Sequence, residues 1–194
     1  AARRWYARAH QACGWVASQS GHSVSEVAGA AAALSPGTPW SKNLAGAWAM
    51  ATGRDGLARS FHSYGEDNYE KARRCLRGED PMDALGTDKA LKVKPFYRSV
   101  MLIGGAGTGH RWIYQVNRRG YSSSTPPKGH HRACWTAMRR LASMLGMKSY
   151  QAQALVWLRE REDAEDESVE YDPMEAARRV PLARHLRGAP LKHW

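Results

Sequence analysis

The sequence predicts an all-α fold. Apolar residues recur at helical spacing along most of the first 160 residues, helix caps and helix-ending residues separate these segments, and strand-like alternation is nearly absent. At 194 residues and 21.6 kDa the chain fits one domain with an appendage, and it can bury a core without disulfide or metal staples. We therefore expect a helical domain over residues 1–159, followed by a charged linker and a short C-terminal helix over residues 160–194.

The first three helices are predicted by their apolar faces and by the residues at their ends. Apolar residues at i, i+4, i+7, i+8 and i+11 from Trp5 place one buried face on a first helix. Ser23 and Glu26 have the spacing of a capping box at the start of a second helix, which Ser35–Gly37 ends. Pro39 suits the first position of a third helix, because its missing N–H would have no partner there.

The remaining helices are predicted from shorter apolar repeats and from proline positions: near 66–77, from about Pro95, at about 110–118, at 129–145 and at 149–162. A polar loop is expected before residue 66 and a short turn at Asp80-Pro81. Residues 120–129, GYSSSTPPKG, are expected to form an exposed loop. The string Asp172-Pro173-Met174-Glu175 has the pattern of a helix start and predicts the C-terminal helix.

Positive charge is concentrated in the predicted domain. The net charge of the chain is +11, but residues 1–159 hold 23 Lys and Arg against 9 Asp and Glu, which gives +14. Residues 160–194 have a net charge of −3, and eight of the 18 acidic residues lie in 160–172, as in a solvated helix end or linker. A basic body attracts polyanions because their condensed counterions are released. Nucleic acid is therefore the expected partner.

Several other classes of protein are disfavoured by the sequence. Cys13, Cys75 and Cys134 are widely spaced and form no C-x-x-C pair, so we expect small core residues in a reducing compartment and no metal site. The glycine-rich residues 104–109, GGAGTG, lack the Lys-Ser/Thr and the preceding strand of nucleotide-binding loops. No apolar run approaches the roughly 20 residues that a bilayer requires. We expect a soluble cytoplasmic protein without cofactor or membrane contact.

Three strings in this order resemble the helix-hairpin-helix (HhH-GPD) DNA glycosylase superfamily, which includes endonuclease III and small phage and actinobacterial members. They are ALSPGTPWSKNLAGAW at 33–48, YEKARRCLRGEDPMDAL at 69–85 and KVKPFY at 92–97. The first is similar to the family's "LSAQT" helix junction, and the other two to segments on either side of its hairpin. The resemblance covers roughly residues 3–160. It implies a helical domain that binds double-stranded DNA in the cytoplasm of a bacterium or a phage-infected host cell.

The resemblance also implies a chemistry and shows where this chain departs from it. Such enzymes extrude a base, fill the gap with a wedge and cleave the bond between base and sugar, with a carboxylate beside the sugar cation and in some members an attacking lysine. Lys92 occupies the place of that lysine. The family's "VTIDRW" reads GTGHRW at 107–112, so His110 occupies the place of the aspartate. An imidazole supplies no negative charge, which argues against ordinary hydrolysis.

Two further parts of the family's pattern are altered. The glutamine wedge falls near Gly37, and the hairpin pattern Leu-Pro-Gly-x-Gly is reduced to residues 85–88, LGTD. The predicted catalytic residues are His110 and Lys92. The residues expected to contact DNA are basic, aromatic or part of these strings: Lys89, Lys94, Arg111, Trp112, Tyr114, Lys128, His130, Arg132, Gly37 and Asn43.

Each of these residues also has a purely structural interpretation. Lys92 either contacts phosphate or acts as a nucleophile, and His110 is either a satisfied polar residue or part of a pocket. Trp112 and Tyr114 are candidates for stacking on an extruded base, or for a buried helix face. His130 and His131 suit phosphate contact better than metal binding. The other tryptophans at helical spacing are expected in the core: Trp40, Trp48, Trp135 and Trp157.

Three functions follow from these observations. The first is a DNA glycosylase-like protein that binds DNA and flips a base, including a modified one, with His110 in the aspartate's place. The second is a transferase that uses the same base-flipping pocket in phage DNA hypermodification. The third is a catalytically silent DNA-binding protein.

Overall fold

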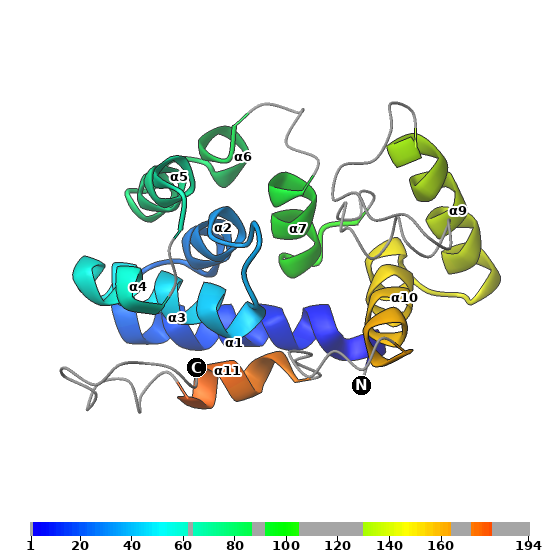
Figure 1. Cartoon of the computed structure of the whole chain (residues 1–194), viewed down its shortest axis with the longest axis horizontal. Helices are drawn as coiled ribbons and strands as arrows, with labels where there is room; N and C mark the ends of the chain where they lie inside the picture. The colour runs from blue at the N-terminus through cyan, green and yellow to red at the C-terminus, as the bar shows by residue number, and fades with distance from the viewer. Residues whose placement is uncertain (1, 62–63, 87–91, 105–129, 164–171, 180–194) are drawn as a thin grey trace.

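The computed structural model describes residues 2–61, 64–86, 92–104, 130–163 and 172–179, and every regular element in these ranges is helical (Figure 1). The all-α class predicted from the sequence is confirmed for this part of the chain. A 3₁₀ turn, η1 (Ala2–Arg4), precedes the α-helices, which are α1 (Trp5–Ser20), α2 (Val24–Ala33), α3 (Trp40–Ala51), α4 (Asp55–Phe61), α5 (Glu66–Leu76), α6 (Pro81–Ala84), α7 (Val93–Val100), α9 (His130–Met144), α10 (Ser149–Asp163) and α11 (Pro173–Arg179).

Helix α1 is the centre of the arrangement. It packs against α2, α3, α7, α10 and α11, and Figure 1 shows α2 and α7 on one side of it and α11 on the other. The apolar face predicted from Trp5 onward is buried as expected. Among the described residues, four aromatic rings lie within 6.4 Å of the Trp5 ring between centroids, from α1, α3, α7 and α10: Tyr6, Trp40, Phe96 and Trp157. Helices distant in sequence therefore share one core.

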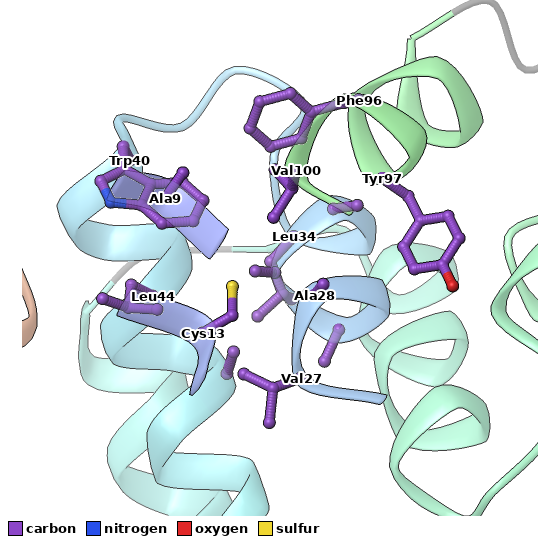
Figure 2. Packing of buried hydrophobic residues seen from close by; sticks show 14 of the residues in the cluster. Ala9, Cys13, Val27, Ala28, Leu34, Trp40, Leu44, Phe96, Tyr97 and Val100 are labelled. Atoms are coloured by element: carbon purple, nitrogen blue, oxygen red, sulfur yellow. The ribbon is translucent and has the colours of Figure 1, made fainter. Parts of the chain in front are cut away.

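Helix α2 crosses this core and is buried along almost its whole length (Figure 2). Its start is the predicted capping box, in which Ser23 Oγ accepts from the Glu26 N–H and the Glu26 carboxylate accepts from the Ser23 N–H. Small side chains let other helices approach closely. At Gly29 an added Cβ would lie 2.9 Å from both Cys75 Sγ and Pro81 Cβ, so α5 and α6 pack directly on the α2 backbone.

The structure corrects three element boundaries. The polar loop expected before residue 66 contains α4, which is only seven residues long and is held by two buried side chains, Ala58 and Phe61. Pro39 is not the first residue of α3 but its N-cap, with an extended ψ of 156°, and its carbonyl accepts the first helical hydrogen bond, from Asn43 N. Helix α7 begins at Val93, two residues before Pro95, because Val93 is itself buried.

Helix α11 is part of the packed structure. Ala176 and Ala177 are buried, and the helix lies against α1 and α3. Trp40 Nε1 donates to the Pro173 carbonyl at 3.1 Å, and the Arg8 guanidinium makes two hydrogen bonds to the Asp172 carboxylate, at 2.5 and 2.7 Å. The sequence predicted this helix as part of an appendage after residue 159, and the structure shows it packed against α1 and α3 of the helical core.

The three cysteines are buried and form no disulfide, as expected of small core residues. Burial raises the pKa of Cys13 and of Cys75 to about 12, because an apolar environment disfavours the thiolate. The predicted core tryptophans Trp40, Trp48 and Trp157 are buried, and Trp135 is half-buried against the same core.

Candidate functional site

The loop between α2 and α3 and the start of α7 meet at one hydrogen bond. Lys92 is the N-cap residue of α7 and is half-buried. Its Nζ donates to the carbonyl oxygen of Ser35 at 2.6 Å. Ser35 follows α2, so two of the three strings that resemble the glycosylases, 33–48 and 92–97, are in contact at this point.

The α2–α3 loop has a defined conformation. Ser35 N donates to the Ala32 carbonyl and Thr38 N to the Ser35 carbonyl, which makes a tight turn around Pro36 and Gly37. Gly37 has a φ of +72°, a left-handed value that glycine adopts without strain, and nothing lies within 4 Å of where its Cβ would be. The turn therefore presents open space at Gly37, where the resemblance implies the wedge.

Asn43 braces this turn from inside. Its side chain is only 2% exposed, and with its amide nitrogen facing the turn it donates to the carbonyls of Pro39 and Leu34 at 3.1 and 3.2 Å. Direct contact with DNA, predicted for Asn43, does not fit this buried position. Its amide instead ties the start of α3 to the end of α2, where the carbonyl of the C-cap residue Leu34 lacks a partner within its own helix.

Ser35, whose carbonyl accepts from Lys92, also has a buried side-chain hydroxyl without a partner among the described residues. The residue is 3% exposed, and its Oγ has no hydrogen-bond partner among the described residues. A buried hydroxyl left unpaired costs about 1–3 kcal/mol. A polar atom of a ligand, or a water molecule, that reached Ser35 Oγ would recover this energy, so the residue whose carbonyl accepts from Lys92 also carries an unused hydrogen-bonding group.

Hydrogen bonds to neighbouring helices hold α7, the helix that Lys92 precedes, in place. Tyr97 Oη and Ser25 Oγ are 2.9 Å apart and share a hydrogen bond, and His10 Nδ1 lies 3.1 Å from the Val100 carbonyl oxygen. These contacts attach α7 to α2 and α1, respectively. Figure 2 shows Val100 of α7 directed toward Leu34 at the end of α2, and the Phe96 ring directed toward the side of Trp40. Lys92 therefore extends from a helix whose position is set by the core.

A comparison with protein families places this chain. The model of a family of unknown function, DUF7178, matches residues 1–164. The chain belongs to this family. No curated protein and no solved structure matches the chain. The match to DUF7178 extends from α1 through α10 and ends before α11.

Some of the remaining predicted site residues of this DUF7178 member lie in the described ranges, and others lie outside them. Lys94 is half-buried in the first turn of α7, and Arg132 is exposed on α9. His130 is the first residue of α9. Six residues lie outside the described ranges, so their predicted roles stay predictions: Lys89, His110, Arg111, Trp112, Tyr114 and Lys128.

Three residues of interest were not among the predicted ones. Ser35 belongs to a predicted string but was interpreted only as part of a helix end. Arg139 and Arg140 are exposed on α9 near Arg132. A segment-by-segment charge count would have found them, because residues 89–159 contain 13 Lys and Arg and no Asp or Glu.

No group of three or more His, Cys, Asp or Glu side chains in the described ranges is arranged to hold a metal ion. None of the helices described is long and apolar enough to cross a membrane.

Proposed function

We propose that this DUF7178 member is a glycosylase-like protein that binds double-stranded DNA and flips a base, with His110 in the place of the catalytic aspartate. The hydrogen bond between Lys92 and Ser35 is the observation that most supports this. A wedge that fills the gap left by a flipped base, and a lysine beside that base's sugar, must lie within about one nucleotide of each other. The resemblance assigns these places to Gly37 and Lys92, and Lys92 contacts the residue two positions before Gly37.

The same bond bears on what Lys92 does. A nucleophilic lysine must bring its nitrogen to the sugar carbon. Lys92 Nζ is instead held against a backbone carbonyl at 2.6 Å. With His110 also unable to supply a carboxylate, the proposal is that the site binds and flips a base without releasing it. In this role Lys92 is a positioning residue that fixes the α2–α3 loop at the gap.

The test uses duplex DNA that carries 2-aminopurine, whose fluorescence rises when it leaves the base stack. We expect binding that weakens steeply as salt rises, together with a fluorescence increase that saturates with protein. Treated duplexes containing ordinary, deaminated or alkylated bases should show no abasic sites. Absence of binding at 50 mM salt, or a flat dependence of log K on log salt, would contradict DNA binding. Binding without a fluorescence change would contradict base flipping.

Two further measurements address the chemistry. Borohydride reduction in the presence of DNA with an abasic site traps an amine that attacks the sugar; we expect no adduct, and an adduct lost in Lys92→Met would overturn the positioning role. His110→Asp restores a carboxylate to the place that the resemblance gives the aspartate. Efficient base release by the unaltered protein, abolished by Asp88→Asn, would show that His110 does not stand in for the aspartate.

A further inference from the structure

The net positive charge of the chain is concentrated in one segment. Residues 1–88 hold 10 Lys and Arg against 9 Asp and Glu, whereas residues 89–159 hold 13 Lys and Arg and no acidic residue. The first segment contributes α1 to α6, and the described helices of the second are α7, α9 and most of α10 (Figure 1). A polyanion is therefore attracted toward the part of the molecule that contains α7, α9 and α10, and not toward the surface of α1 to α6.

Ion pairing increases the difference in available positive charge between the two segments. The cations of α4 and α5 are neutralised by neighbouring carboxylates in five pairs: Arg59–Glu66, Lys71–Asp67, Arg73–Asp55, Arg74–Glu79 and Arg77–Glu70. Arg132, Arg139 and Arg140 of α9 have no ion pair or hydrogen bond from their guanidinium groups in the structure as described. Charges without internal partners remain available to an external anion.

The three α9 arginines lie on one face of the helix. Residues 132, 139 and 140 are separated by seven and eight positions, about two helical turns, and all three are exposed. The opposite face is buried through Cys134, Met138 and Ala142. The positions near the arginines carry small side chains, Ala133, Thr136, Ala137 and Ser143, so a ligand can approach the helix closely.

We propose that the exposed face of α9, formed by Arg132, Arg139 and Arg140, binds the phosphate backbone of double-stranded DNA. This inference rests on the proposed function and adds the surface that supplies its affinity. Two turns of helix separate the arginines by roughly 10 Å. That length corresponds to about three phosphate steps of one strand along the duplex axis. The contacts are to phosphate, so they hold the duplex without reading its sequence.

The experiment compares two triple variants of the full chain that lose the same charge. One is Arg132→Gln, Arg139→Gln and Arg140→Gln. The matched control is Arg59→Gln, Arg74→Gln and Arg77→Gln, which removes three arginines that already have carboxylate partners. Duplex affinity is measured from 50 to 200 mM salt, and circular dichroism with thermal unfolding checks the fold of each variant.

We expect the α9 variant to lose roughly ten- to a hundredfold in affinity, and the magnitude of its log K against log salt slope to fall by about 2 to 3. The control should stay within about threefold of the unaltered protein. Equal weakening of both variants would show that only net charge matters, and an unaffected α9 variant would place the surface elsewhere. In both cases binding by the unaltered protein leaves the proposed function standing. Failure of the unaltered protein to bind DNA would overturn both proposals.

Discussion

Lys92 Nζ and the carbonyl oxygen of Ser35 lie 2.6 Å apart, although 57 residues separate them in the chain. The carbonyl belongs to a residue that is almost fully buried, and it accepts from Lys92 in addition to Thr38 N, whose hydrogen bond is longer at 3.3 Å. A long basic side chain that reaches across to a turn also orders the turn. The contact therefore links the stability of the α2–α3 loop to a residue of the candidate site.

Removing the donor should destabilise the fold. Lys92→Met keeps most of the apolar stem but removes the charged donor, which leaves the Ser35 carbonyl with only the longer hydrogen bond from Thr38 N. We therefore expect the free energy of unfolding to fall by about 1.5–3 kcal/mol, the contribution of a hydrogen bond that involves a charged group. Urea denaturation followed by circular dichroism measures it. Arg132→Met, at an exposed position of α9, is the control and should change stability by about 0.5 kcal/mol or less. If the two variants had the same urea midpoint, the hydrogen bond from Lys92 to Ser35 would not contribute to stability.

Two glycine substitutions should change the free energy of unfolding in opposite directions. Gly29→Ala places a Cβ 2.9 Å from Cys75 Sγ and Pro81 Cβ, and we expect a loss of about 1–3 kcal/mol through overpacking between α2, α5 and α6. Gly56→Ala in α4 meets nothing within 4 Å and should stabilise by about 0.4–1 kcal/mol, because alanine has less freedom in the unfolded chain. Thermal unfolding distinguishes them. A stabilised Gly29→Ala protein would mean that the helices are not in close contact there.

The ion pair between Arg8 and Asp172 should make stability depend on pH in the acid range. The hydrogen bonds from Arg8 hold the pKa of Asp172 below its ordinary value. The stabilisation is therefore complete above about pH 4, the ordinary aspartate value, and is lost as the pH falls through the lower folded-state pKa. Both side chains are more than a third exposed, so solvent screening keeps the contribution of this ion pair small. Asp172→Asn should unfold at a lower temperature than the unaltered protein at pH 7, and the difference between the two unfolding temperatures should shrink as the pH falls below about 4.

Deleting residues 172–194 should weaken the fold. Without α11, Trp40 Nε1 loses its acceptor and the faces of α1 and α3 that α11 covers become exposed. We expect a lower unfolding temperature and increased accessibility of Trp40 to acrylamide quenching of fluorescence. A truncated chain with unchanged unfolding and quenching would show that the helix is not needed in the core.

Much of the fold could be predicted because its early helices carry strong local signals. Trp5 begins a long apolar repeat, and Ser23 with Glu26 marks a helix start by hydrogen bonds between residues three apart. Such signals lie within one segment of sequence. Helix α4 was missed because seven residues with two buried side chains leave too short a repeat to recognise.

The packing of α11 and the candidate site depend on partners distant in sequence. Ala176 and Ala177 are small, and nothing in the sequence near them indicates that Trp40 lies opposite. A polar residue such as Asn43 can lie on a surface or be buried under a turn, and the sequence alone does not distinguish the two. The carbonyls that its amide reaches in the folded chain account for its buried position. The contact of Lys92 with Ser35 followed from no periodicity; the family resemblance alone brought the two strings into one argument.

The place of α11 also has a consequence for how the protein forms during synthesis. Helix α1 is made before the helices that pack on it, yet one of these partners ends at residue 179, so a chain growing on the ribosome cannot cover α1 completely until residue 179 has emerged. Contacts between distant parts of a chain slow folding even in helical proteins. The aromatic side chains of α1 therefore pass through a period in which part of their surface is exposed, and this period is when the nascent chain is most open to aggregation and to chaperones.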